Sequence, residues 1–353
     1  MIQLRLTTNP GIEDVVEKEL YDRASQMGCK IETIKRQPFD LQGQVLVESQ
    51  DEKLAEVACK ARSLFHVMRQ VYHFSLTPEE DPLPQIHETI IGLDIPEMHS
   101  AQTFRVTTKR SGGHQFKSAD VQKIAGAALN KHYGTAVSLD NYDVNVRVDV
   151  YDRLCLVSVQ LTREGLDRRQ KKLWRPRISL KTTIAYGMLH LAQLEGTGRL
   201  LDPFCGSGTI LIEAASLFPS LELYGSDRRE EAIKGTQENL MANHCSDRVH
   251  VKQLDARDLA TGYPAGYFRA IVTNAPYGMR LSPEIDFSRL YGKFLHGAEQ
   301  ILAPGGCIVI LVGKGRGAFK KLIARSQTLE ILEERLVETG ELYPHLFVIR
   351  KSV

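Results

Sequence analysis

The tetrapeptide Asn274-Ala275-Pro276-Tyr277 directly follows an apolar run, RAIVT, that is typical of a buried strand. An exocyclic amine on a nucleobase is a poor nucleophile, and its two N–H groups need two acceptors. The side-chain oxygen of Asn274 and the backbone carbonyl of Ala275 could supply both, so catalysis would consist mainly of positioning. Pro276 fixes its own φ and keeps Ala275 out of the helical region, and Tyr277 offers a stacking surface for a base. An ordinary strand-ending turn is the competing interpretation.

A glycine pair lies further upstream, in the stretch LLDPFCGSGTILIEAA. Gly206-Ser207-Gly208 opens a predicted helix directly after a predicted strand. Glycines at such a turn let a ligand approach the backbone closely, and the helix N-terminus offers free N–H groups. A dinucleotide fingerprint would need a third glycine and a P-loop would need a lysine, and neither is present. The pattern GKGRG at residues 313–317 lacks the P-loop ending as well, and we interpret it as a plain turn.

Three successive predicted strands of this half carry an acid at or just after their ends, namely Asp202, Asp227 and Asp255. In a doubly wound sheet that edge forms the ligand crevice. The second acid could accept hydrogen bonds from both ribose hydroxyls, and the third could accept one from an adenine amine. Each acid alone could be a helix N-cap. Together, beside Gly-Ser-Gly, they indicate an adenosine ligand without phosphates.

The obvious ligand of this kind is S-adenosylmethionine, a methyl donor that leaves S-adenosylhomocysteine as its product. The residues predicted to bind it are Thr183, Asp202, Cys205, Gly206, Ser207, Gly208, Asp227, Asp255, Ala256 and Asn274.

The elements that must position these residues alternate regularly from Gly198 onward. Short apolar runs such as RLLDPF and LELYGSD are each followed by a helical pattern. This alternation predicts an α/β fold with a mostly parallel sheet and helices on both faces. The last two runs, ILEERLVETG and HLFVIRKSV, have no helix between them, which predicts an antiparallel pair at one edge.

The first half has a different pattern. Valines alternate in YDVNVRVDV, and the turn YDR leads into LCLVSVQL, which predicts a hairpin. Helical patterns, EDVVEKELYDRASQM and SADVQKIAGAALNKHYG, lie between strands and indicate one or two small α+β domains. The segment TPEEDPLPQIHE contains three prolines and is predicted to be a loop or linker.

Between the halves, residues 168–181 carry seven positively charged side chains, Arg177 among them, and no acidic one. A solvated linker is one interpretation. A polyanion would relieve the mutual repulsion of these charges, which is the other. The candidate phosphate contacts are Lys109, Arg110, Lys117, Arg147, Arg168, Arg169, Lys171, Lys172 and Arg175.

Composition excludes several classes of protein. The 353 residues include 45 Lys plus Arg against 43 Asp plus Glu, so the net charge of +2 identifies no partner. Six scattered cysteines without C-x-x-C spacing indicate reduced thiols in a cytoplasmic protein rather than a disulfide framework or a metal site. The first residues lack the apolar core of a signal peptide, and no apolar run reaches the roughly 18 residues of a membrane span.

These motifs also carry a resemblance. DPFCGSGT followed by TNAPYG resembles the class I RNA methyltransferases that modify exocyclic amines, whose fourth motif usually reads Asn or Asp, Pro, Pro, aromatic. Here Ala275 replaces the first proline. TTNPGIEDVVEKEL, FRVTTKRSGGHQFKSADV and RISLKTTIAYGML resemble segments of THUMP-containing methyltransferases. The ending ETGELYPHLFVIRK is most similar to the tRNA guanine-N2 methyltransferases that act on guanosine 6 of the acceptor stem.

The resemblance implies a domain plan and an activity. The plan is a ferredoxin-like α+β domain over 1–60, a THUMP domain over 61–166, a basic linker over 167–178 and a Rossmann-like methyltransferase domain over 179–353. The implied protein is a monomer without a metal, and its THUMP domain grips the 3′ end of tRNA. A stem guanine would have to leave its helix to reach Tyr277.

Several alternatives remain open at the level of sequence. A 23S ribosomal RNA guanine-N2 methyltransferase would share the same motifs. The Asn274 loop would equally serve a DNA adenine or a protein glutamine amide. A catalytically silent RNA-binding protein is the remaining class, motivated by the missing proline at position 275.

Overall fold

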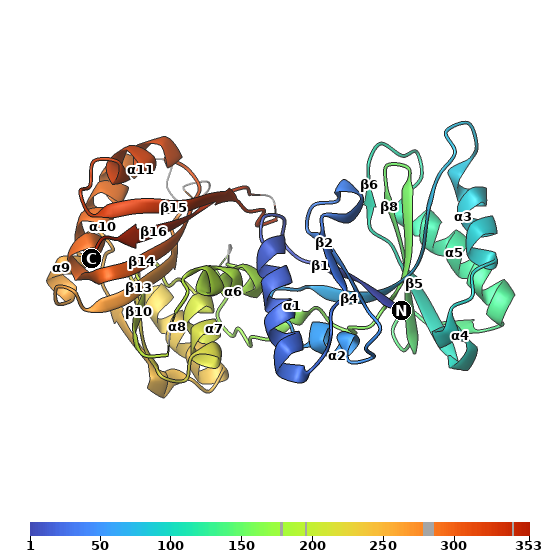
Figure 1. Cartoon of the computed structure of the whole chain (residues 1–353), viewed down its shortest axis with the longest axis horizontal. Coiled ribbons are helices and arrows are strands. Elements are labelled where there is room, and N and C mark those ends of the chain that lie inside the picture. The colour runs from blue at the N-terminus through green and yellow to red at the C-terminus, as the bar shows by residue number, and fades with distance from the viewer. Residues whose placement is uncertain (177–178, 195, 278–285, 341) are drawn as a thin grey trace.

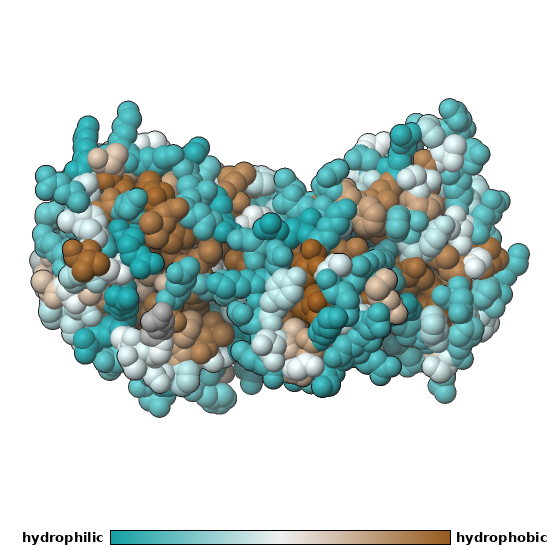
Figure 2. All heavy atoms as spheres, viewed as in Figure 1, coloured by the Kyte–Doolittle hydropathy of each residue, from teal (hydrophilic) through white to brown (hydrophobic). Residues whose placement is uncertain are grey.

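The computed structural model describes residues 1–176, 179–194, 196–277, 286–340 and 342–353. The chain forms two lobes, each built on one β-sheet, with helix α1 at the waist between them (Figure 1). Hydrophilic residues cover much of the face shown in the space-filling view, the waist included (Figure 2). Among the described residues, no helix has both the length and the apolarity to cross a membrane.

The first lobe contains the elements β1 (Ile2–Thr7), α1 (Glu13–Met27), β2 (Thr33–Arg36), η1 (Pro38–Asp40), β3 (Gln44–Ser49), α2 (Leu54–Cys59), β4 (His66–Ser75), α3 (Pro82–Ile91), α4 (Pro96–Ser100), β5 (Thr103–Thr107), β6 (Arg110–Ser111), α5 (Ser118–Tyr133), β7 (Ala136–Val137), β8 (Val144–Tyr151), β9 (Leu154–Gln160) and η2 (Leu166–Arg168). The second lobe contains α6 (Thr182–Leu191), β10 (Gly198–Asp202), α7 (Thr209–Leu217), β11 (Leu221–Asp227), α8 (Glu230–Ala242), η3 (Ser246–Arg248), β12 (Val249–Gln253), α9 (Leu259–Gly262), β13 (Phe268–Asn274), α10 (Phe287–Ile301), β14 (Leu302–Val312), α11 (Arg316–Ile323), β15 (Leu329–Leu336) and β16 (His345–Lys351).

The second-lobe sheet has the order β12-β11-β10-β13-β14-β16-β15. Strands β10 to β14 are parallel to one another, whereas β16 is antiparallel to both β14 and β15. Apolar cores cover both faces, which explains why the inner strands are nearly continuous apolar runs. The predicted α/β class, the parallel sheet and the antiparallel edge pair are confirmed.

The first-lobe sheet has the order β2-β3-β1-β4-β9-β8-β5-β7, with β6 also paired to β8. The predicted hairpin is β8 and β9. Strand β4 is long enough to pair with β1 at its start and with β9 along most of its length, so the sheet runs unbroken across residue 60. The division of this half at residues 60 and 61 coincides with no break in the sheet, and the first apolar core continues past it to Ala61, Leu64 and Val67; the division remains a prediction.

The proline-rich segment TPEEDPLPQIHE is a loop only in its first part, residues 77–81. Residues 82–91 form α3, and Asp81 caps it by accepting a hydrogen bond from the backbone N–H of Leu83. Pro82 and Pro84 lie in the first turn, where backbone N–H groups have no partner within the helix, so proline is tolerated there. The prolines therefore indicate where this helix begins, and they do not prevent it from forming.

A buried ion pair lies in the middle of the first-lobe sheet. A guanidinium nitrogen of Arg5 lies 2.7 Å from a carboxylate oxygen of Asp149, and both side chains are almost fully buried. Arg147 binds the other carboxylate oxygen at 2.9 Å. Burial alone would raise the pKa of Asp149, but the charges of Arg5 and Arg147 outweigh it and lower that pKa.

A second buried carboxylate lies where the lobes meet. Glu213 on α7 is 1% exposed and accepts hydrogen bonds from Arg62 of the first lobe at 2.8 Å and from Arg169 at 2.9 to 3.2 Å. Gln170 also donates to it, at 3.0 Å. We call residues 169–174 the strap, because this part of the predicted linker is bound down on the second lobe.

The remainder of the strap is fixed on α8. The backbone of Lys171 exchanges two hydrogen bonds with the side chain of Asn243, and the backbone of Trp174 does the same with Asn239. The indole of Trp174 lies over Gly235, where any Cβ would come within 2.1 Å of the ring. The interpretation of a solvated linker is therefore wrong for residues 169–174.

Replacing Glu213 with Gln should lower the free energy of unfolding by about 2–3 kcal/mol, because two partly buried guanidinium groups lose their carboxylate. Urea unfolding followed by the fluorescence of Trp174, the single tryptophan, measures this change. The control is Glu230→Gln, which removes an exposed carboxylate on α8 and should leave the midpoint unchanged. Equal midpoints for Glu213→Gln and the unmutated chain would contradict the prediction.

Candidate active site

The predicted polar residues gather at the carboxyl edge of the second-lobe sheet. Asp202, Asp227 and Asn274 are the last residues of β10, β11 and β13, and Asp255 follows β12 by two residues. Strands β11 and β12 extend the sheet on one side of β10, whereas β13 and β14 extend it on the other. Ligands of doubly wound sheets bind at such a reversal.

The glycine loop joins β10 to α7 in a conformation that needs its glycines. Gly206 and Gly208 have φ angles of 54° and 76°, which side chains disfavour. A Cβ on Gly208 would lie 3.0 Å from Thr236, and the hydroxyl of Thr236 donates to the carbonyl of Gly206 at 2.8 Å. Around Gly206 the nearest atom to such a Cβ would be 3.7 Å away, so a ligand has room to approach the backbone there.

Asp202 and Asp227 support this loop in different ways. Asp202 is 2% exposed and accepts from the hydroxyl of Thr273 at 2.6 Å, which joins β10 to β13. Burial raises its pKa to about 7, against the opposing effect of that hydrogen bond. Asp227 accepts from the N–H of Gly206 at 3.3 Å and from Arg229, and it keeps some exposure at the crevice. Of the two, Asp227 is the one that can reach a ligand.

Asp255 lies at the same edge with its carboxylate engaged by Arg257. Three nitrogens of Arg257, one of them in the backbone, donate to it at 2.6 to 3.0 Å. Hydrogen bonds from Arg257 lower the pKa of Asp255 against the effect of burial. Ala256 beside it is buried. A bound adenine amine would have to share this carboxylate with Arg257.

Two predicted cofactor contacts have their side chains committed elsewhere. Thr183 on α6 is fully buried, and its hydroxyl donates to the side-chain oxygen of Asn9 in the first lobe at 2.7 Å. The thiol of Cys205 is buried beside the hydroxyl of Thr236 at 3.7 Å. The side chain of Thr183 thus ties the lobes together, and Cys205 can contribute only its backbone.

The Asn274 loop follows β13 and packs on the end of β14. The N–H of Ala275 donates to the carbonyl of Leu311 at 3.2 Å, and Ala275 is 1% exposed. Contact with β14 therefore restrains the position where the related motif usually has its first proline. Residues 278–280 of the stretch TNAPYGMR lie outside the described residues.

Tyr277 does not offer the stacking surface that the sequence predicts. Its ring is 9% exposed and packs against Gly313, where a Cβ would lie 2.6 Å from the ring. Its hydroxyl donates to the side-chain oxygen of Asn274 at 2.6 Å. Burial raises the pKa of Tyr277, so this hydroxyl keeps its proton at neutral pH. Gly313 and Gly315 belong to the GKGRG segment. Gly313 contacts the Tyr277 ring, and Gly315 is the residue directly before α11.

The candidate phosphate contacts divide into two groups. Arg147, Arg169 and Lys172 are turned inward and bind Asp149, Glu213 and two hydroxyls, respectively, so they are poorly placed to hold RNA. Arg110 is half-buried and bonds to Gly112 and His114. The exposed members are Lys109, Lys117, Arg168, Lys171 and Arg175. Arg177, counted among the charges of the junction, lies outside the described residues.

Sequence reasoning missed the residues that hold the glycine loop from α8. Asn239 is fully buried, and its amide donates both to the carbonyl of Ser207 at 3.0 Å and to that of Trp174 at 2.8 Å. Thr236, one turn earlier, is fully buried as well. Both residues occupy positions of the helical repeat that are otherwise apolar and face the core. A polar side chain at such a position needs a buried hydrogen-bond partner, and this signal could have identified both.

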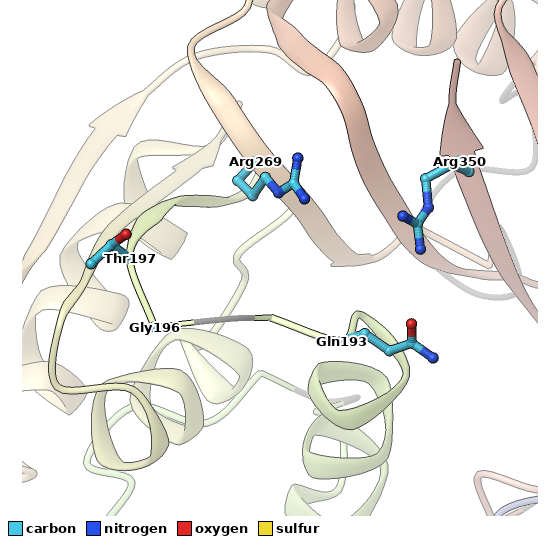
Figure 3. Close-up of a pocket in the computed structure, with 5 residues that line it drawn as sticks. All are labelled: Gln193, Gly196, Thr197, Arg269 and Arg350. Atoms are coloured by element: carbon cyan, nitrogen blue, oxygen red, sulfur yellow. The ribbon is translucent and has the colours of Figure 1, made fainter. Parts of the chain in front are cut away.

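A cavity of about 430 Å³ lies at the other edge of the sheet (Figure 3). It is lined by Gln193, Gly196, Thr197, Arg269 and Arg350, which lie near the amino ends of β10 and β13. None of the predicted site residues lines it, so it is separate from the candidate active site.

Comparison with known proteins gives matches over both halves. A family model for the RMKL-like methyltransferase domain matches residues 169–345, and one for the THUMP domain matches residues 81–160. The tRNA (guanine(6)-N2)-methyltransferase of Thermus thermophilus is 34% identical over 349 residues, 99% of each chain. The protein of the same name from Archaeoglobus fulgidus is 28% identical, over 99% of this chain and 92% of that one.

A solved structure agrees with these matches. The crystal structure of TrmN from Thermus thermophilus has a TM-score of 0.80 and 32% sequence identity, over 99% of this chain and 100% of that one. The exact domain limits and the roles of single site residues remain predictions. The full-length relative and the paired domains identify the chain as a member of the family of THUMP-containing class I RNA guanine-N2 methyltransferases.

Proposed function

We propose that the chain transfers a methyl group from S-adenosylmethionine to the exocyclic N2 of guanosine 6 in the acceptor stem of tRNA. The observation that carries this proposal is the placement of Asn274 at the end of β13, next to β10 and its glycine loop, in a chain that matches guanine(6)-N2 methyltransferases over its whole length. A 23S ribosomal RNA substrate remains the alternative.

The residues at the carboxyl edge fit the proposed methyl donor. A Cβ at Gly206 would make only an ordinary contact with Phe204, so a ligand could approach the backbone there, and the neighbouring carboxylate of Asp227 could accept from ribose hydroxyls. Asp255 and the buried Ala256, at the same edge, would contact the adenine. When bound, the sulfonium supplies an electrophilic methyl carbon, and S-adenosylhomocysteine is left as product.

Asn274 would act by orienting the exocyclic amine of the guanine. Its side-chain oxygen and the carbonyl of Ala275 accept the two N–H groups of the amine, which leaves the nitrogen lone pair directed at the methyl carbon. The donor would supply the methyl carbon to that lone pair, its sulfur would keep the electron pair of the broken S–C bond, and the nitrogen would release one proton to solvent water. In the described structure the hydroxyl of Tyr277 already donates to the Asn274 oxygen, and the second lone pair of that oxygen can accept an N–H of the base.

Exposed cations of the first lobe and the junction are the proposed phosphate contacts: Lys109, Lys117, Arg168, Lys171 and Arg175. Their contacts would offset the few kcal/mol needed to extrude a paired base. Human U6 snRNA (guanine-N(2))-methyltransferase THUMPD2 is 30% identical, but the match covers 60% of this chain and 41% of that protein. Full-length matches therefore favour tRNA. A monomer in the cytoplasm is part of the same proposal.

Incubation with labelled S-adenosylmethionine and an unmodified tRNA transcript, followed by digestion to nucleosides, should yield labelled N2-methylguanosine. A matched transcript with inosine at position 6, which lacks the N2 amine, should take up no label. Label in the inosine transcript would place the methyl group at another site. If no RNA yielded a labelled nucleoside, the proposed activity would be excluded.

Asn274→Ala should lower kcat by at least about tenfold, because positioning of the amine is the main contribution of this residue. Affinity for S-adenosylhomocysteine, measured by calorimetry, should change by less than about twofold. Asn274→Asp keeps an acceptor oxygen and should retain more activity than the alanine variant. If Asn274→Ala lost cofactor affinity and turnover in equal measure, the residue would be a cofactor ligand instead.

Asp227→Ala should weaken the binding of S-adenosylhomocysteine by at least about tenfold, because two hydrogen bonds from ribose hydroxyls to a carboxylate are lost. Calorimetry without RNA measures this effect. Asp247→Ala is the control, since Asp247 is an exposed acid near the end of the same βα unit. An unchanged Kd for Asp227→Ala would exclude the ribose role.

A further inference from the structure

Lys172 is an inward-facing cation in the strap. Exposure alternates along this segment, so that Lys171 and Leu173 face solvent whereas Gln170, Lys172 and Trp174 face the second lobe. The ammonium of Lys172 donates to the hydroxyls of Ser179 and Thr209, both at 2.7 Å, and to the carbonyl of Leu180 at 3.5 Å. It therefore lies at the first turn of α7, next to the glycine loop.

A third hydroxyl completes this cluster. The side-chain oxygen of Ser207 lies 3.0 Å from that of Ser179 and 3.2 Å from that of Thr209. Ser207 belongs to the glycine loop, which begins at Gly206 with a hydrogen bond to Asp227. Four consecutive residues thus lead from the carboxylate proposed to bind ribose to the ammonium of Lys172.

The charge of Lys172 has no counter-ion in the described part of the chain. The contacts of its ammonium are neutral oxygens, and Glu213, the acid one turn further along α7, is already shared by Arg62 and Arg169. Burial, with a smaller effect of Arg175, lowers the pKa of Lys172 to about 8. An ammonium that is largely desolvated and lacks a counter-ion is unfavourable.

A purely structural role does not explain this position. A cation at the start of a helix opposes the helix dipole, so Lys172 does not stabilise α7 by its charge. An anion bound between the ammonium, the hydroxyls and the free N–H groups of that first turn would supply the missing counter-ion. It would also interact favourably with the dipole of α7.

We propose that Lys172 binds the carboxylate of the amino-acid end of the methyl donor. The inference rests on the proposed function, because S-adenosylmethionine carries its adenosine at one end and a carboxylate at the other. With the ribose at Asp227, the loop from Gly206 to Thr209 spans the path to the other end. Lys172 is then a determinant of cofactor specificity that distinguishes the amino acid from the same thioether without its carboxylate.

The test is a cycle of two proteins and two ligands. The unmutated chain and Lys172→Met are titrated by calorimetry, without RNA, with S-adenosylhomocysteine and with its decarboxylated form, S-adenosyl-3-thiopropylamine. The unmutated chain should prefer S-adenosylhomocysteine by at least about tenfold, the value of one charge-assisted hydrogen bond. In Lys172→Met this preference should fall to about twofold or less, while affinity for the decarboxylated compound stays nearly the same.

Two further variants complete the design. Lys172→Arg keeps the charge and should restore part of the preference. Lys234→Met, the same substitution at an exposed lysine of α8, should change neither affinity. Trp174 fluorescence confirms that the strap stays in place in each variant.

Each outcome separates this inference from the proposed function. If Lys172→Met weakened both ligands equally, or neither, the carboxylate assignment would be overturned while cofactor binding stood. If the unmutated chain bound neither ligand, the proposed function would fail and this inference with it.

Discussion

The buried carboxylate of Glu213 is a central contact between the two lobes. It receives Arg62 from the first lobe, and Arg169 and Gln170 from the strap, while its own helix α7 begins at the glycine loop. In a site almost closed to water, such charge-assisted hydrogen bonds are strong and directional. One side chain therefore connects the lobe that carries the THUMP domain to the loop proposed to hold the methyl donor.

The strap extends this connection to α8. Gly235 lies in the middle of that helix, where glycine costs about 1 kcal/mol relative to alanine. Glycine is nevertheless required at position 235, because the indole of Trp174 occupies the space that a side chain would need. Asn239 then links the carbonyls of Trp174 and Ser207 through a single amide. A segment with the composition of a linker is thereby part of the wall of the candidate active site.

Features set by local chemistry could be predicted from the sequence. The alternation of strands and helices after Gly198, the acids at strand ends and the Asn274 turn all follow from short-range periodicity and turn residues. The helix at residues 82–91 was missed because three prolines outweighed the capping signal of Asp81. The inward-facing contacts of Thr183, Arg169 and Lys172 could not be predicted from the sequence, for a different reason. Their partners Asn9, Glu213 and Thr209 are 37 to 174 residues away in sequence, and only the folded chain brings them together.

The hydrogen bond between Tyr277 and Asn274 has a consequence for how a base is chosen. In the structure the side-chain oxygen of Asn274 accepts from the Tyr277 hydroxyl, and its second lone pair can still accept one N–H of the proposed guanine amine. The hydroxyl would thus orient the acceptor before the base binds. A purine with hydrogen or oxygen in place of that amine would leave the second lone pair without its donor. Under the proposed function, discrimination among bases would arise from that missing hydrogen bond.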